Sequence, residues 1–288
     1  MTGRRMTLAD DPADDLGLFG PGSVTWRLHE EPILFLAGLR SLFLQALHPR
    51  ALAGVMQNSD YRADPWGRLV RTSAFVGTTI YGTTAQADAA GRRVRAIHAR
   101  LRATDPRTGE EFRVDDPGLL RWVHVAEVES FVATARRAGV RLTDADVDAY
   151  YTEQRRAAAL VGLDPATVPG TAAEIAAYYD GVRAELAISR DAAEIVVFLL
   201  APPMPWGLGF TPVRVAYTAV AVTAFGLLPP WARRLYGALN LPGADLTASL
   251  SVRALRAAIN TIPRRLYEGP NYRAAMARAE LAGARSAR

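Results

Sequence analysis

The hydrophobic and polar positions of this chain recur with the period of an α-helix over almost its whole length. Apolar residues at intervals of three and four form one stripe on a helix and predict a face that packs against a core. No alternating pattern is long enough for a substantial strand, although the turn-rich connector at residues 105–118 is compatible with a small hairpin. The pattern predicts an all-α fold in one large helical domain.

Prolines and capping residues predict where the helices begin and end. Pro49 predicts a break near His48, because proline disfavours a helical conformation in the residue before it. Pro65 suits the first turn of a helix, and Thr84 and Thr143 are expected to be N-caps. The predicted helices span residues 32–47, 50–57, 65–82, 85–103, 117–138, 144–160, 171–188, 192–200 and 213–228, with further helices to about residue 266.

Composition and charge narrow the class of protein. Hydrophobic residues make up 50% of the 288 positions and charged residues 22%, which is typical of a globular domain. The net charge is +5, but the arginines are spread along the chain without a basic, aromatic-rich stripe, so we expect no nucleic-acid partner. We expect a loose arm at residues 1–22, the domain at residues 23–267 and a tail at residues 268–288.

Two segments of the sequence bear on the cellular location of the protein and on contact with a membrane. The first fifteen residues have no apolar core, so we do not expect a secretory signal and we predict a cytoplasmic protein. The stretch VRVAYTAVAVTAFGLL (residues 213–228) is about one turn short of a membrane-spanning helix and contains Arg214. It is interpreted as a buried helix, with a peripheral membrane contact as the alternative. The oligomeric state is not predicted.

The absence of cysteine removes several kinds of chemistry. Disulfides, thiolate haem ligands, iron–sulfur clusters and cysteine-type zinc sites are excluded. No P-loop, zincin motif, nucleophile elbow or dinucleotide fingerprint occurs, and no Glu-x-x-His motif of a di-iron bundle is present. A single-histidine cofactor site is the strongest metal hypothesis that remains, and a haem in an apolar helical pocket suits it.

Four histidines are available to such a site. His98 lies in VRAIHARL (residues 94–101), where it shares an apolar helix face, and it is either a core histidine or a ligand. His48 ends an apolar helix and either caps carbonyls or faces a pocket. His124 lies three residues before Glu127, close enough to share a hydrogen bond or a metal. His29 is expected at the surface.

The stretch RLVRT (residues 68–72) contains a second candidate group. Arg68, Arg71 and Thr72 share one helix face, and two guanidinium groups at this spacing repel each other unless an anion or a carboxylate lies between them. Either they form two separate surface salt bridges, or they line a pocket that binds an anion or oxygen.

Five stretches in this order resemble one known family. They are QALHPRALAGV (residues 45–55), RLVRT (68–72), VRAIHARL (94–101), DDPGLLRWVHVAEVES (115–130) and YYTEQRRAAALVGL (150–163). Together they resemble the DUF2236 family, also described as the MpaB–rubber oxygenase (latex clearing protein) catalytic domain family. The resemblance covers residues 23–267.

The resemblance implies a haem b protein with a globin-like helical core and one proximal histidine, which corresponds to His98. It implies a basic distal wall at Arg68, Arg71 and Thr72, with arginine where rubber oxygenases have lysine. On this basis, dioxygen would be stabilised by Arg71, Thr72 or His48. Arg68 would anchor a propionate or a carboxylate, and an apolar substrate would enter beside the iron under residues 202–212. The glutamate base of rubber oxygenases has no counterpart, since no glutamate occurs between Glu31 and Glu110, which argues against polyisoprene cleavage.

The sequence thus predicts a haem b-dependent oxygenase that acts with dioxygen on an apolar, lipid-like small molecule. A sensor or carrier without turnover is the first alternative, and a second axial ligand from His48 or His124 would favour it. A helical lipid- or partner-binding protein without haem is the second alternative.

Overall fold

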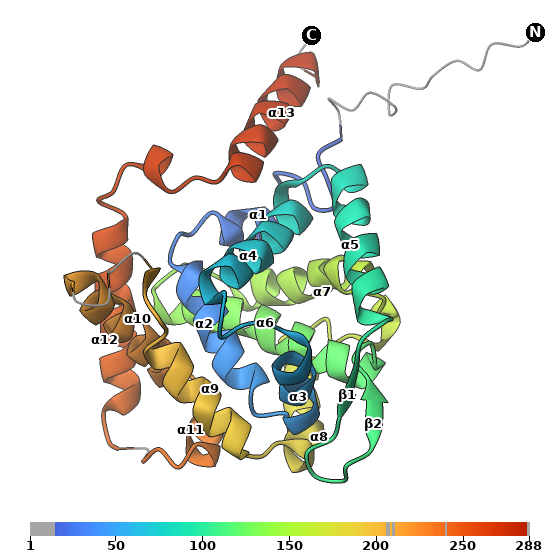
Figure 1. The fold of residues 1–288 in the computed structure, drawn as a ribbon. Coiled ribbons are helices and arrows are strands. Elements are labelled where there is room, and N and C mark those ends of the chain that lie inside the picture. Colours follow the sequence, from blue (N-terminus) through green and yellow to red (C-terminus); the bar gives the residue numbers. More distant parts are fainter. Residues whose placement is uncertain (1–14, 206–207, 209–210, 240, 287–288) are drawn as a thin grey trace, which may run out of the picture.

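The computed structural model describes residues 15–205, 208, 211–239 and 241–286. Its helices surround a central pair, α2 and α6, and the only strands in the described residues form one short hairpin (Figure 1). The all-α prediction is confirmed. The elements are α1 (Val24–His29), α2 (Leu34–Gln45), α3 (Pro49–Asn58), α4 (Pro65–Tyr81), α5 (Thr84–His98), β1 (Arg102–Thr104), β2 (Glu111–Arg113), α6 (Pro117–Arg137), α7 (Asp144–Leu160), η2 (Pro165–Thr167), α8 (Ala172–Val182), η3 (Arg183–Glu185), α9 (Arg190–Leu200), α10 (Pro212–Gly226), α11 (Pro230–Leu235), α12 (Ala244–Ile259), η5 (Arg264–Leu266) and α13 (Pro270–Ser286).

Local sequence explains most helix starts. His48 is the extended N-cap residue between α2 and α3, as Pro49 predicted. Asp64 accepts a hydrogen bond from the Gly67 amide at the start of α4, and Thr143 forms a capping box at the start of α7. These caps satisfy amides that have no partner within their helices.

Three predicted boundaries were wrong. Thr83, not Thr84, caps α5, because its hydroxyl accepts the Gln86 amide while the Gln86 side chain accepts the Thr83 amide. The same helix ends at His98 instead of continuing to residue 103, because Arg102–Thr104 pairs with Glu111–Arg113 in the hairpin. Likewise, α8 ends at Val182 and a single 3-10 turn follows it.

The core is built around α2 and α6. Side chains from α2, including Leu36 and Phe43, pack against Trp122 and Val125 of α6 and are fully buried. A buried ion pair crosses this interface, with Arg40 Nη1 at 2.6 Å from a carboxylate oxygen of Glu129. Helices α10 and α12 close another side of the core.

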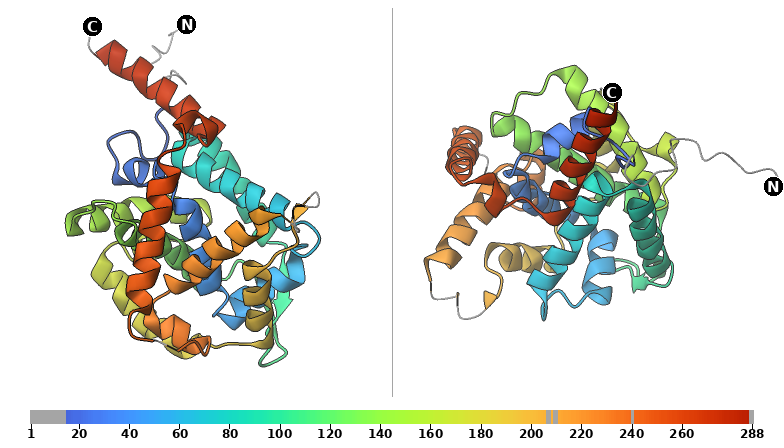
Figure 2. Two further views of the ribbon diagram at one scale, coloured as in Figure 1. Left: turned by 90° about the vertical axis from the view of Figure 1, so that its left-hand side faces the viewer. Right: turned by 90° about the horizontal axis from the view of Figure 1, so that it is seen from above.

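The segment expected to be a tail, residues 268–288, forms α13 over most of its length. Figure 2 shows α13 leaving the body at the end where α1 and α4 lie. Its first half packs on α4, where Asn271 donates a hydrogen bond to Thr78 and Tyr272 stacks edge-on against Tyr81. Among the described residues, no helix combines the length and the hydrophobicity needed to cross a bilayer.

Candidate functional site

Helix α5 carries His98 as its last residue, at the end of an apolar stripe that packs poorly. Val94, Ile97 and Leu101 belong to none of the buried clusters of the described residues, and Ile97 is 49% exposed. Val94 and Leu101 are half-buried, so this stripe leaves apolar surface beside His98 that a ligand could cover.

The His98 ring lacks a hydrogen-bond partner. Its Nδ1 atom is buried and unpartnered, and neither ring nitrogen forms a hydrogen bond within the described residues. Burial lowers the pKa of His98, and the nearby Asp115 carboxylate opposes that shift. A neutral imidazole without partners is available to coordinate a metal.

A second unpartnered histidine lies on α6. His124 is 8% exposed, its Nε2 atom is buried without a partner, and burial lowers its pKa to about 4. Glu127 follows one turn later and forms no hydrogen bond or ion pair within the described residues. Burial raises the pKa of Glu127 to about 7. A carboxyl group with this pKa can hold or release a proton near neutrality.

His29 was predicted at the surface, and the structure leaves it partly exposed, with its ring packed against neighbouring side chains. Its Nε2 atom lies 3.2 Å from the hydroxyl of Tyr150, and its ring packs edge-on against Phe131 of α6. Burial lowers the pKa of His29 to about 3. Since Tyr150 also interacts electrostatically with Glu127, His29, Tyr150 and Glu127 form one polar cluster.

The RLVRT residues on α4 differ in their surroundings. Arg71 is exposed and pairs with Asp64 at 3.0 Å, and Thr72 is also exposed. Arg68 is more enclosed and donates to the Ser59 hydroxyl, but it has no carboxylate partner within the described residues. Burial, with a contribution from Arg71, lowers the pKa of Arg68. One surface salt bridge therefore forms instead of two, and Arg68 keeps an unneutralised positive charge.

His48 is engaged elsewhere. Its Nδ1 accepts the Ala51 amide at 3.4 Å, its Nε2 lies 3.4 Å from a carboxylate oxygen of Glu185, and its ring lies near Trp122. No described contact joins His48 to Arg68, Arg71 or Thr72, so the structure does not bring these four predicted residues together.

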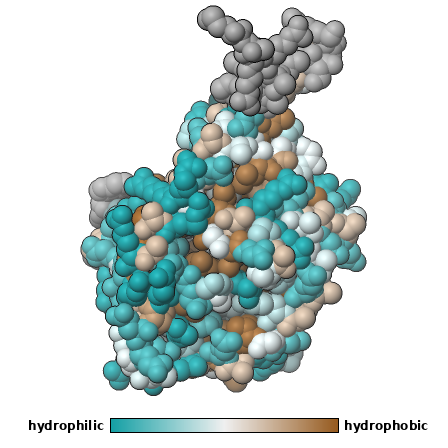
Figure 3. All heavy atoms as spheres, turned by 90° about the vertical axis from the view of Figure 1, so that its right-hand side faces the viewer, coloured by the Kyte–Doolittle hydropathy of each residue, from teal (hydrophilic) through white to brown (hydrophobic). Residues whose placement is uncertain are grey.

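These residues are compatible with a haem, and no hydrogen bond or ion pair within the described residues joins His98 to Arg68. No cluster of three or more metal-binding side chains occurs within the described residues. A haem iron needs only one protein imidazole, since the porphyrin supplies four ligands. His98 offers that imidazole, Arg68 an uncompensated positive charge for a propionate, and the α5 stripe an apolar wall. Figure 3 shows hydrophobic residues exposed along the middle of one face of the molecule, between hydrophilic rims.

The sequence paired Glu127 with His124, but it did not predict the raised pKa of Glu127 or the contact between His29 and Tyr150. A lone charged residue on a helix is normally read as solvent-facing, and His29 lies in a charged-looking stretch, RLHEE. The available signal was that Leu120 and Phe131 share a helix face with His124 and Glu127, so that face could enclose a carboxyl group.

Comparison with known proteins gave one match. A family model described as "ER-bound oxygenase mpaB/B'/Rubber oxygenase, catalytic domain" matches residues 26–261, which is most of the chain. No curated protein and no solved structure gave a significant match.

Proposed function

Because the chain belongs to the mpaB/rubber oxygenase catalytic-domain family, we propose that it is a haem b-dependent oxygenase that acts with dioxygen on an apolar, lipid-like small molecule. The observation that carries the haem proposal is the buried, unpartnered Nδ1 of His98 at the end of an unpacked apolar stripe. A buried polar atom normally has a partner, and a haem ligand with its surroundings would account for the exception.

In this proposal, His98 would hold the haem iron, and Val94, Ile97 and Leu101 would provide apolar contacts around it. The guanidinium of Arg68 binds a propionate, because it has no carboxylate of its own within the described residues. Bound haem supplies the redox chemistry with dioxygen. Arg71 and Thr72 remain candidates to stabilise negative charge on oxygen by hydrogen bonding. His48, whose ring is engaged with Glu185, has no part in the proposal.

Glu127, which the sequence paired with His124, adds a group that can hold a proton near neutral pH. Its pKa of about 7 leaves the carboxyl group partly protonated at neutral pH. Glu127 can therefore hold or release a proton near neutral pH, while His124 remains neutral one turn before it. Glu127 lies on α6, outside the stretch between Glu31 and Glu110 where no glutamate occurs.

A haemin titration of the purified protein tests the proposal. We expect stoichiometric uptake with a Soret band, confirmed by a pyridine-haemochrome assay, and a loss of that band in His98→Ala. His48→Ala is the matched control and should bind haemin like the wild type. Arg68→Gln should weaken uptake more than Arg71→Gln, although both variants remove one charge from the same helix. A protein that takes up no haemin would refute the proposal.

The unpartnered Nε2 of His124 favours one second candidate, a carrier or sensor with two axial histidines. Such a protein would show a six-coordinate spectrum that His124→Ala converts to five-coordinate. An oxygenase of the proposed kind would instead consume dioxygen in the reduced form with an apolar substrate present.

A further inference from the structure

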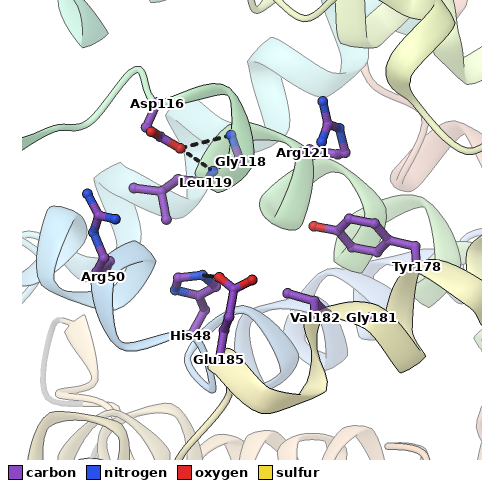
Figure 4. Close-up of a pocket in the computed structure, with 10 residues that line it drawn as sticks. All are labelled: His48, Arg50, Asp116, Gly118, Leu119, Arg121, Tyr178, Gly181, Val182 and Glu185. Carbon is purple, nitrogen blue, oxygen red and sulfur yellow. Dashed lines mark hydrogen bonds and ion pairs between the residues drawn. The ribbon is translucent and has the colours of Figure 1, made fainter.

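A separate cavity of about 280 Å³ lies between the beginnings of α3 and α6 and the end of α8 (Figure 4). It is lined by polar side chains that the proposed oxygenase chemistry does not use. The principal ones are His48, Arg50, Arg121, Tyr178 and Glu185.

Two arginines, two carboxylates and two helix N-termini lie around this cavity. The N-termini of α3 and α6 both border it, and helix N-termini carry partial positive charge. Arg50 and Arg121 stand on different sides, and each has a buried Nε atom without a hydrogen-bond partner in the described residues. Arg50 Nε nevertheless lies 3.6 Å from a carboxylate oxygen of Asp105, and the Arg50 guanidinium stacks on the Phe112 ring at 4.5 Å. Arg121 donates a hydrogen bond to the Thr167 hydroxyl through another nitrogen.

The two carboxylates that line the cavity are already engaged. Asp116 accepts the amides of Gly118 and Leu119 as the N-cap of α6. Glu185 lies against His48 Nε2, but its side chain is 64% exposed and is free to turn into water. Neither carboxylate therefore neutralises the arginines directly.

Neutral hydrogen-bond donors complete the lining. Because His48 Nδ1 accepts an amide proton, its ring proton lies on Nε2, which points toward Glu185 and the cavity. Burial lowers the pKa of His48, with Arg50 and Arg107 acting in the same direction and Glu185 against it, so the ring is neutral at neutral pH. The Tyr178 hydroxyl projects into the cavity (Figure 4), and burial raises its pKa to about 12.

We propose that this cavity binds a small molecule with one carboxylate and a short apolar body. The carboxylate would accept hydrogen bonds from an arginine and from Tyr178 or His48, and the apolar body would lie against Leu119 and Val182. The volume equals that of about nine water molecules in the liquid, which suits a ligand the size of benzoate. The Glu185 carboxylate lies against the Nε2 donor of His48, so it competes with the ligand carboxylate for that hydrogen bond.

Titration calorimetry with benzoate tests the proposal, together with NMR of the His48 ring, and neither measurement needs haem. Benzamide is the matched neutral ligand, and inorganic phosphate is the matched anion without an apolar body. We expect saturable binding of benzoate, a shift of the His48 signals, and no saturable binding of benzamide. Phosphate that binds as tightly as benzoate would overturn the carboxylate assignment.

Variants locate the site. Arg121→Gln should weaken benzoate binding by about tenfold or more, because it removes a charge-assisted hydrogen bond. Glu185→Gln should strengthen it by about threefold, because it removes the competing negative charge. Arg100→Gln, on the surface after α5, is the control. Equal affinity in Arg121→Gln and the wild type would overturn the proposal. If that variant does not fold, the wild-type protein still tests the proposal, because equal affinity for benzoate and benzamide would overturn it.

Discussion

Replacing Glu127 with glutamine should change how the stability of the fold depends on pH. Glutamine has nearly the same shape but does not ionise. In the wild type, burial raises the pKa of Glu127 from 4.5 to about 7. The folded state therefore holds the proton more tightly than the unfolded chain. The resulting stabilisation is fully present below pH 4.5 and is lost as the pH rises through about 7.

The size of this effect follows from the two pKa values. One pKa unit corresponds to about 1.4 kcal/mol, so complete ionisation of Glu127 costs the fold about 3 kcal/mol. The Glu127 side chain is not fully excluded from solvent, so this value is an upper limit. Between pH 5 and pH 9, the free energy of unfolding of Glu127→Gln should therefore rise relative to the wild type by up to about 3 kcal/mol.

Urea denaturation followed by tryptophan fluorescence, at closely spaced pH values, measures this difference. Other titrating groups are common to both proteins, so their effects cancel in the comparison. Glu111→Gln, on the exposed edge of β2, is the matched control and should follow the wild type. If the curves for Glu127→Gln and the wild type stay parallel from pH 5 to pH 9, then the Glu127 carboxyl group is hydrated or paired and our reasoning about it is wrong.

Three further predictions concern stability. Thr83→Ala removes the capping box of α5 and should cost about 1 kcal/mol in urea denaturation, whereas the exposed Ser73→Ala should cost little. Arg40→Ala leaves the Glu129 charge without its partner and should lower the free energy of unfolding by about 3–5 kcal/mol. A double variant, Arg40→Met with Glu129→Gln, removes both charges, and it would contradict this reasoning if it were no more stable than Arg40→Ala. As the pH falls from 6.5 toward 4, stability should decrease because the unfolded chain binds a proton at His124 that the folded state, with a pKa of about 4, does not. His124→Gln should show a shallower decrease in the same urea measurements.

Much of the fold followed from local signals in the sequence. The break at His48 and the start of α4 come from proline geometry, and the start of α7 comes from a threonine cap. These effects act within one turn of the chain, so they are visible without tertiary structure. The end of α5 was not predictable in this way, because it depends on strand pairing across the hairpin.

The candidate site was harder to predict because burial depends on distant contacts. RLVRT put Arg68 and Arg71 on one helix face, yet only Arg68 is enclosed, beside Ser59, while Arg71 meets Asp64 in solvent. The charged surroundings of His29 concealed its contact with Tyr150, which lies 121 positions away. The spacing of residues in the sequence indicates which of them share a helix face. The packing of other elements against that face decides which of its residues are buried from solvent.

The two ends of the described chain meet at the junction of α4 and α5, and this has a consequence for the order of folding. Asp15 accepts hydrogen bonds from Thr84 at the start of α5, and Arg278 of α13 donates to the backbone of both Asp15 and Tyr81. Contacts separated by more than 260 positions carry a large loop-closure entropy and tend to form late. We therefore expect the helices that carry Arg68 and His98 to become rigid last, after the α2–α6 core. A cofactor would then bind after the α2–α6 core has folded. In apoprotein that lacks α13, we expect the core to stay folded and the amide protons of α4 and α5 to exchange faster than in the full chain.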